Sequence, residues 1–257
     1  MKRSSRISRR IASPLCAAVV LLVPAVTSAS LANADEGSGP LGVTSVAGVS
    51  SRSVRVGALF PAGQASSLAG NHHCTASVVH SPNRNLIVTA AHCLDGDGEF
   101  VFVPGYRDGK APYGVWTVKR RFLPDGWKQG QDEDSDVAFG IISYQDGRGI
   151  EDLVGGNRFA SGTTTGATAV TITGYPSSDE EPVSCTNKPI AHSRTQQRID
   201  CPSLSNGTSG SPWVNGDGQV VGVLGGHEQG GDTDDISYSV VLGSEAAELY
   251  RDAAADP

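Results

Sequence analysis

The sequence predicts an all-β protein built from many short strands. Glycine and proline are abundant, with 32 and 14 residues in a chain of 257, whereas charged residues make up only 18%. Glycine and proline mark turns, and an average globular chain is about 25% charged. This composition disfavours a coiled coil or a helical bundle. The length suffices for one large or two small β domains, either of which can bury its own core.

Short apolar or alternating segments recur from Val54 onwards, and turn residues separate them. The expected strands include 76–79, 86–89, 99–103, 115–119, 137–142, 168–173, 219–224 and 236–241. Strands at this spacing favour a β-sandwich or a β-barrel. Residues 146–156 form the best internal boundary. One short helix is expected at about 244–253, where Ser244 can cap its first turn.

Residues 1–34 have the pattern of a secretory signal peptide. The first ten residues carry five cations and no acid, and residues 11–26 are mostly apolar. Ala32 and Ala34 fit the small-residue cleavage pattern, which places the cut after Ala34, with a cut after Ala29 as the alternative. A permanent anchor is disfavoured because the apolar run is short and interrupted by proline. The mature protein is therefore expected to be secreted, extracellular and free of the membrane.

The mature chain is expected to be acidic. Loss of residues 1–34 removes five cations and no acids, so the formal net charge changes from −7 to −12. An acidic chain without clustered lysine and arginine argues against nucleic-acid binding. Residues 35–53 are small, polar and rich in glycine and serine, which is typical of a short pro-segment or a flexible lead-in. A single folded domain is expected over residues 54–257.

The cysteines predict disulfides. Of the five, Cys16 leaves with the signal peptide, and an even number in an exported chain indicates bridges. Four cysteines allow three pairings, of which Cys74–Cys93 with Cys185–Cys201 is the simplest because each couple is close in sequence. Free thiols are the alternative. A metal site is disfavoured because no C-x-x-C or H-x3-H spacing is present. No metal and no cofactor are expected.

Three short motifs carry residues that together can hydrolyse an amide. They are TAAHC at 89–93, DVA at 136–138 and GTSGSP at 207–212. Amide hydrolysis needs a nucleophile, a base, a group that orients the base, and donors for the oxyanion. Serine, histidine and aspartate fill the first three roles. Gly207 and Gly210 flank the serine and allow a tight turn that aims backbone N–H groups at one point.

The order of these motifs resembles the trypsin/chymotrypsin-like serine peptidases, and most of all their secreted bacterial members. The resemblance extends from about Val54 to Tyr250. It implies two six-stranded antiparallel β-barrels packed with the active site in the cleft between them, and a short C-terminal helix. The first barrel would cover about 54–148 and the second about 157–243. The bridge beside the histidine motif also matches the family's disulfide around its catalytic histidine.

The resemblance also assigns roles to individual residues. His92 is expected to be the general base, Asp136 the residue that orients it, and Ser209 the nucleophile that forms an acyl-enzyme. The backbone N–H groups of Gly207 and Ser209 are expected to form the oxyanion hole.

Other residues of the same types are alternatives to the three assigned ones. Asp136 is preferred because it leads directly into an apolar run, and Ser209 because it lies between the two glycines. The alternatives are Asp132, Asp134, Ser205, Ser211, His72, His73, His80, His192 and His227.

The serine motif departs from the family pattern at Thr208 and at Ser211, which replaces a glycine as in the bacterial members. Thr208 stands where many animal members have an aspartate that binds the newly cut N-terminal amine, so that route of activation is not available. Ser203 falls near the floor of the primary pocket and is neutral, which disfavours cleavage after lysine or arginine. Gly225 and Gly226 leave the pocket edge open. Glutamate specificity through His227 and Ser203 is an alternative.

The sequence therefore predicts a secreted serine endopeptidase that acts on polypeptides as a monomer. A protein inhibitor is a possible second partner. The alternative from another functional class is a peptidase-like binding module without catalytic activity.

Overall fold

The computed structural model describes residues 40–257. The predicted signal peptide lies outside the described residues. Among the helices of residues 40–257, none is both long enough and apolar enough for a membrane span.

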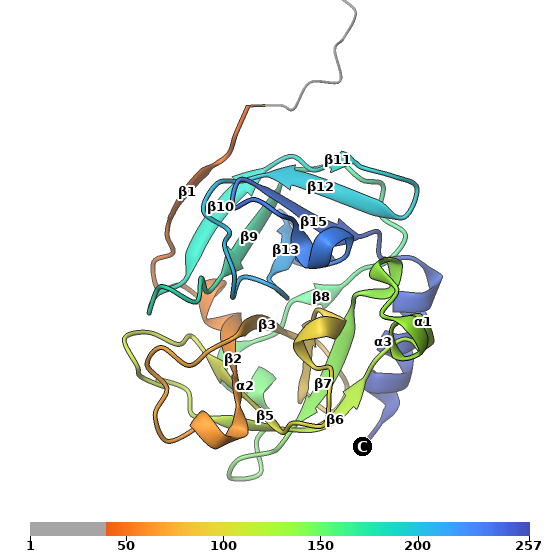
Figure 1. Cartoon of the computed structure of the whole chain (residues 1–257). Coiled ribbons are helices and arrows are strands. Elements are labelled where there is room, and N and C mark those ends of the chain that lie inside the picture. Colours follow the sequence, from red (N-terminus) through yellow and green to blue (C-terminus); the bar gives the residue numbers. More distant parts are fainter. Residues whose placement is uncertain (1–39) are drawn as a thin grey trace, which may run out of the picture. The chain divides into compact units, whose positions relative to one another are not determined.

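Six antiparallel strands in the first half close into a β-barrel, in the order β2-β3-β4-β7-β6-β5 (Figure 1). Its walls are rich in β-branched and aromatic residues that are buried along whole strands, as in β4. Closure leaves no unpaired strand edge. The strands are β2 (Val56–Pro61), β3 (Cys74–Val79), β4 (Leu86–Thr89), β5 (Phe100–Pro104), β6 (Trp116–Phe122) and β7 (Ala138–Ile142).

The second half contains a six-stranded sheet, in the order β1-β10-β9-β13-β14-β8, and a three-stranded sheet, β11-β12-β15. β8 pairs with β14 in parallel, whereas the other pairs are antiparallel. The strands are β1 (Val43–Val46), β8 (Arg158–Phe159), β9 (Val170–Gly174), β10 (Val183–Asn187), β11 (Ile190–Ala191), β12 (Gln196–Asp200), β13 (Pro212–Asn215), β14 (Gln219–Val223) and β15 (Ile236–Val240).

The predicted fold class is confirmed, with a difference in how the second half closes. Between β14 and β15, side chains take the place of backbone ladder bonds: the N–H of Val223 donates to Ser239 Oγ at 2.9 Å. Similarly, Gln197 Nε2 of β12 donates to the carbonyl of Val221 at 3.2 Å. The second half therefore consists of two sheets joined by side-chain hydrogen bonds and by isolated backbone bonds, such as that from the N–H of Gly225 to the carbonyl of Tyr238 at 3.0 Å, rather than by a continuous ladder.

The expectation of a flexible lead-in is corrected by β1. This strand pairs with β10 in the register Val43↔Thr186 to Val46↔Val183. The N–H of Ala47 then donates to the carbonyl of Pro182 at 2.8 Å. Ordered structure begins before Val54, since the segment forms the outer strand of the second half's larger sheet.

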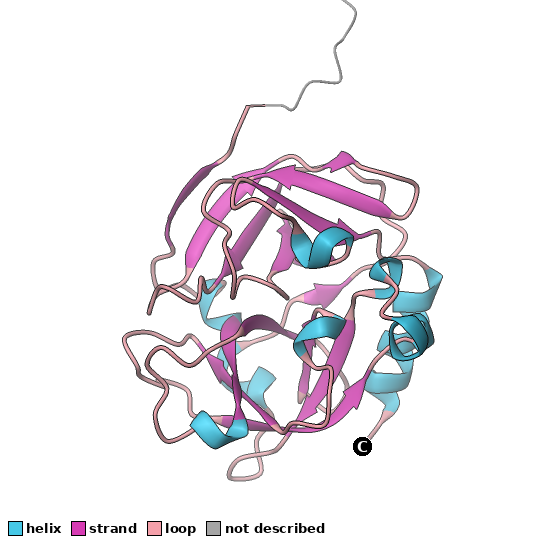
Figure 2. Cartoon of the chain, in the orientation of Figure 1, coloured by secondary structure: helices cyan, strands magenta, loops and turns pink. Residues whose placement is uncertain are grey.

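Helices are few and short (Figure 2). They are α1 (Asp125–Gly130), α2 (Ile150–Val154) and α3 (Ser244–Ala255). The expected cap at Ser244 does not form, because Gly243 takes the N-cap position and no side chain caps the helix. Glu245 in the first turn instead accepts a hydrogen bond from Ser135 Oγ at 2.9 Å.

The two halves share apolar core. One cluster of buried side chains runs from the barrel into β14, β15 and α3, and it includes Val223, Val240 and Ala246. A second cluster fills the larger sheet around Trp213 and the Cys185–Cys201 disulfide. The shared cluster holds the ends of β4, β7 and β14 near one another, and these ends carry the predicted site.

Candidate active site

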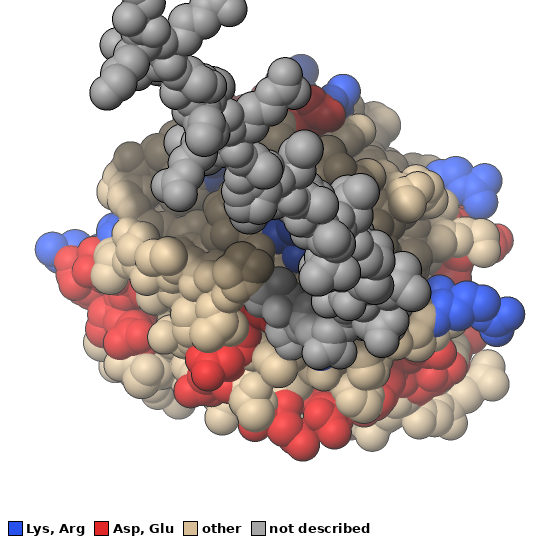
Figure 3. Space-filling view, turned by 90° about the horizontal axis from the view of Figure 1, so that it is seen from above, with Lys and Arg blue, Asp and Glu red and all other residues tan. Residues whose placement is uncertain are grey.

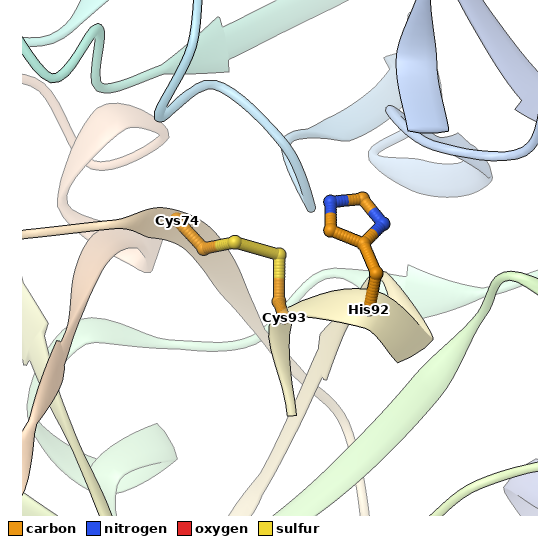
Figure 4. Close-up of side chains that lie close together, drawn as sticks. All are labelled: Cys74, His92 and Cys93. Atoms are coloured by element: carbon orange, nitrogen blue, oxygen red, sulfur yellow. A yellow bond between two sulfur atoms is a disulfide. The ribbon is translucent and has the colours of Figure 1, made fainter. Parts of the chain in front are cut away.

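His92 lies in a single helical turn, η3 (Ala91–Cys93), directly after β4. The Cys74–Cys93 disulfide joins this turn to the first residue of β3. Figure 4 shows the disulfide and the imidazole of His92 projecting from neighbouring positions of the turn. The side chain of His92 is 13% exposed. The turn is therefore fixed by a covalent bond, while the ring stays accessible to solvent.

Asp136 is fully buried and makes three hydrogen bonds through its carboxylate. Oδ1 accepts from the backbone N–H of His92 at 3.0 Å, and Oδ2 lies 2.7 Å from His92 Nδ1. Oδ2 also accepts from the N–H of Gly226 at 2.8 Å. A carboxylate at Nδ1 selects the tautomer that has its proton on Nδ1, which leaves Nε2 free to accept a proton.

Ser209 lies in the loop between β12 and β13, and its backbone is anchored to β3. The carbonyl of Ser209 accepts from the N–H of Thr75 at 2.7 Å, and the N–H of Gly210 donates to the carbonyl of Leu224 at 2.7 Å. Gly210 has φ +82°, and a Cβ there would overlap the carbonyl of Thr75. Only glycine therefore allows the serine loop to approach β3 this closely.

The structure brings the serine loop against the histidine turn without joining the two reactive side chains. A Cβ on Gly210 would lie 3.2 Å from the backbone nitrogen of Ala90, two residues before His92. Within the described residues, no hydrogen bond joins Ser209 Oγ to His92. Such bonds are often long in unliganded enzymes and shorten when substrate binds.

The predicted oxyanion donors are free to bind a ligand. The N–H groups of Gly207 and Ser209 donate to no other described residue. The loop is held by neighbouring groups instead, since Thr75 Oγ1 donates to the carbonyl of Gly207 at 3.0 Å.

Thr208 and Ser211 close the serine loop locally. Thr208 is 1% exposed, and its hydroxyl donates to the carbonyl of Ser205 at 2.7 Å. The hydroxyl of Ser211 donates to the carbonyl of Thr208 at 2.6 Å. These bonds hold the loop without a charged group at position 208. No pattern in the sequence predicted this hydrogen bond of Ser211.

A cavity of about 140 Å³ lies beside Ser209, and its walls include Leu204, Leu224, Asp232 and Asp234. No lysine, arginine or histidine is among its lining residues in the described chain. The two aspartates come from the loop before β15. Their approach to Ser209 has no signal in the linear sequence.

The three predicted substrate-binding residues do not line this cavity. Ser203 is exposed and has φ +64°. Gly225 and Gly226 pack elsewhere, because a Cβ on Gly225 would lie 2.7 Å from Asp136 Oδ2 and one on Gly226 would overlap Gln196 Oε1. Leu204 and Leu224, each next to one of these positions, form the wall instead.

His73 supports the histidine turn, a part that sequence reasoning missed. Its Nε2 lies 3.1 Å from the carbonyl of Cys93 and so acts as the donor, and its ring packs on Phe100. Burial lowers the pKa of His73, which favours the neutral form of the ring. Trp127 of α1 lies on another side of the turn, with its ring centroid 6.3 Å from that of His92.

A metal does not fit the group formed by Cys74, His92 and Cys93. Their side-chain nitrogen and sulfur atoms lie within 4.8 Å of one another. Both sulfurs are bonded to each other in the disulfide, however, and a metal needs a thiolate.

A mostly β fold in two halves, with a histidine–aspartate pair facing a glycine-framed serine, defines the class of trypsin-like peptidases. Residues 74–223 match the family described as "Trypsin-like peptidase domain". This match covers more than half of the chain, which therefore belongs to the trypsin-like peptidase family.

Two bacterial protease structures are similar over most of the chain. The protease Anisep from Arthrobacter nicotinovorans is 26% identical, with a TM-score of 0.71, covering 83% of this chain and 100% of that one. The thermostable serine protease AL20 from an extremophilic microorganism is 25% identical, also with a TM-score of 0.71, covering 81% and 100%. A Glu endopeptidase structure at 17% identity and a TM-score of 0.68 shares the fold.

One curated relative matches over part of its length. The glutamyl endopeptidase of Bacillus licheniformis is 29% identical over 133 residues, which are 49% of this chain and 41% of the relative. The matched stretch thus spans about two fifths of that protein.

Proposed function

We propose that the chain is a secreted serine endopeptidase whose catalytic triad is His92, Asp136 and Ser209. The observation that carries this proposal is the buried Asp136 carboxylate, which bonds both the backbone and Nδ1 of His92. The loop of Ser209 lies against the same turn. Membership of the trypsin-like peptidase family supports polypeptide substrates.

In this mechanism Ser209 Oγ attacks the carbonyl carbon of the scissile bond while His92 Nε2 accepts its proton. The N–H groups of Gly207 and Ser209 donate to the oxyanion of the tetrahedral intermediate. His92 then gives the proton to the leaving amine, and an acyl-enzyme remains. Water, activated by the same imidazole, hydrolyses the acyl-enzyme. Asp136 keeps its hydrogen bond to Nδ1 and stabilises the imidazolium.

The charge of the cavity beside Ser209 supports a preference for basic or neutral side chains. Asp232 and Asp234 lie in its wall, where their carboxylates can bind a lysine or arginine side chain. The neutral Ser203, which disfavoured such residues in the sequence, is not part of this wall. Acidic side chains also gather along one rim of the face in Figure 3, and the expected mature charge of −12 attracts basic polypeptides at low salt.

Glutamate specificity remains the second candidate, because the curated relative is named a glutamyl endopeptidase. The acidic residues around the cavity and around His227 favour glutamate specificity less than a preference for basic or neutral side chains. His227 does not line the cavity, and its ring nitrogens face Glu133 at 3.5 Å and Glu228 at 3.7 Å. A substrate carboxylate would thus meet acids on both sides.

Export fits the covalent structure. Two disulfides form in the structure, and such bonds persist in oxidising compartments. We infer a signal-peptide cut after Ala34 and a monomeric mature enzyme. Because β1 is part of the folded sheet, we infer that residues from about 40 onwards stay with the enzyme. Substrate contacts at Ser203, Gly225 and Gly226 stay predictions for the bound complex.

Labelling with a serine-directed phosphonate tests the nucleophile. Peptide mapping should find the adduct on Ser209, and Ser209→Ala should lose both the label and peptidase activity. Ser205→Ala is the matched control, because Ser205 lines the same cavity. It should keep the label. An adduct on another serine would refute the assignment, and a folded, unlabelled wild-type protein would favour the binding module.

Cleavage-site profiling on a denatured proteome tests specificity. Basic or neutral residues are expected before the cut, and Asp234→Asn should reduce cleavage after lysine and arginine. Predominant cleavage after glutamate would reverse the assignment in favour of the second candidate.

A further inference from the structure

The carboxylate of Asp136 depends on segments from both halves of the molecule. Asp136 follows the turn η4 (Glu133–Ser135), which belongs to the first half. Its third hydrogen bond comes from the N–H of Gly226, which precedes the turn η5 (His227–Gly230) of the second half. The distance between η4 and η5 therefore decides whether this bond exists.

The side chain of Gln196 lies between these two turns. Gln196 is the first residue of β12 and is 4% exposed. Its Nε2 donates to the carbonyl of Glu133 at 3.0 Å and to Asp134 Oδ1 at 2.8 Å. Its Oε1 accepts from the N–H of His227 at 3.3 Å. Both N–H donors and the oxygen of one buried amide are thus used to join η4 to η5.

Gly226 packs directly on this amide. Its φ is +81°, and a Cβ at this position would overlap Gln196 Oε1. The backbone of Gly226 is thus held between Gln196 on one side and Asp136 Oδ2 on the other. Moving or removing the amide would let the N–H of Gly226 leave the carboxylate.

We propose that Gln196 is a positioning residue for the catalytic base, and this rests on the proposed function. It acts through Asp136: the amide fixes the spacing of η4 and η5, so that the Gly226 N–H and His92 both stay aligned on one carboxylate. Gln196 contacts neither the cavity beside Ser209 nor the reacting atoms. Its loss should affect the rate of the chemical step rather than substrate binding.

The neighbouring residue offers a matched control. Gln197 is also 4% exposed, and its amide also makes buried hydrogen bonds, to the carbonyl of Val221 at 3.2 Å and from Thr165 Oγ1 at 3.3 Å. It points to the other face of β12, away from Asp136. Replacing either glutamine by methionine keeps side-chain length and removes the amide.

The experiment compares kcat and KM of Gln196→Met and Gln197→Met with wild type, at a temperature where thermal scans show each variant folded. Small misplacements of catalytic groups cost up to about 100-fold in rate. Gln196→Met should therefore lose about 10- to 100-fold in kcat, with KM within about twofold of wild type. Gln197→Met should keep its kcat even if its Tm falls.

A second variant covers the case in which Gln196→Met does not fold. Gln196→Glu keeps the oxygen that accepts from His227 but sets a carboxylate against that of Asp134, so kcat should fall with little change in KM. A folded Gln196 variant with wild-type kcat, or an equal loss in Gln197→Met, would overturn the proposal while leaving the proposed function intact. An inactive wild-type protein would overturn both.

Discussion

The two halves of the molecule reach stability in different ways. The first half closes its six strands by backbone pairing alone, and it carries His92 and Asp136. The second half joins two sheets through side-chain and isolated backbone hydrogen bonds and adds the N-terminal strand β1, and it carries Ser209 and the acid-lined cavity. The proposed base and its partner thus lie at the closed barrel, whereas the proposed nucleophile and the cavity lie on loops of the second half.

The largest effect is expected from replacing Asp136, whose carboxylate binds His92 of the first half and Gly226 of the second. Asp136→Asn should lower kcat by about 10⁴-fold, as the corresponding change does in the chymotrypsin-like template, because the amide favours the wrong tautomer of His92. Steady-state kinetics on a peptide substrate measures this. Asp132→Asn is the control, since the side chain of Asp132 accepts from the N–H of Asp134 rather than from His92. A near-wild-type rate for Asp136→Asn would show that another acid orients His92.

Removal of the two disulfides should have different effects: loss of Cys185–Cys201 should lower stability alone, whereas loss of Cys74–Cys93 should also lower kcat. The double change Cys185→Ala with Cys201→Ala opens a loop with a sequence separation of 16, worth about 3 kcal/mol of unfolding free energy. Urea unfolding should show this loss while kcat stays near wild type. The same treatment of Cys74 and Cys93 should lower kcat as well, because that bridge holds the turn of His92. Equal loss of kcat in both pairs would contradict the division between the halves.

The N-terminal strand β1 should contribute less to the free energy of unfolding than a disulfide does. A chain that starts at residue 48 loses β1 and the bond from Gly42 N–H to the carbonyl of Asp200. At about 1 kcal/mol for each hydrogen bond, offset by chain entropy, the unfolding free energy should fall by about 2 kcal/mol. A chain that starts at residue 40 keeps β1 and serves as control. Higher activity in the shorter chain would instead identify this segment as an inhibitory pro-segment.

The smallest effect concerns acid stability in the first half. Burial lowers the pKa of His73 in the folded state, so the unfolded state binds more protons at mildly acidic pH. This residue's contribution is therefore present above the ordinary histidine pKa of about 6.5 and is lost as the pH falls below it. In His73→Phe, unfolding free energy measured between about pH 7 and pH 5 should decline less steeply. An unchanged slope would mean that His73 does not titrate on unfolding.

Local patterns predicted most of the first half. Each expected strand in this half overlaps an observed one, because the apolar runs there end at clear turn residues. The second half was harder, since β1 and β10 pair across about 140 residues and no local pattern reports such a pairing. Ser244 was expected as a cap from its residue type alone, and Gly243 holds that position instead.

The sequence motifs predicted which residues come together at the candidate site. They did not predict the residues that line the cavity or that support Asp136. The structure brings together His92 and Asp136, and Cys74 with Cys93, as their order and spacing indicated. Asp232 and Asp234 reach the cavity only because the loop before β15 folds back over Leu204. Gln196 lies in a polar run, and its hydrogen bonds to η4, the turn before Asp136, join residues that are more than 60 apart in the sequence.

The hydrogen bond between Gly226 and Asp136 spans 90 residues of sequence. In the export that we propose, Asp136 emerges from the channel well before Gly226, and Ser209 lies between them in sequence. The partly exported polypeptide thus lacks the last contact of its own orienting carboxylate. Under the function proposed above, full activity would be reached only after residues up to Gly226 have been exported, so the partly exported chain would have little peptidase activity.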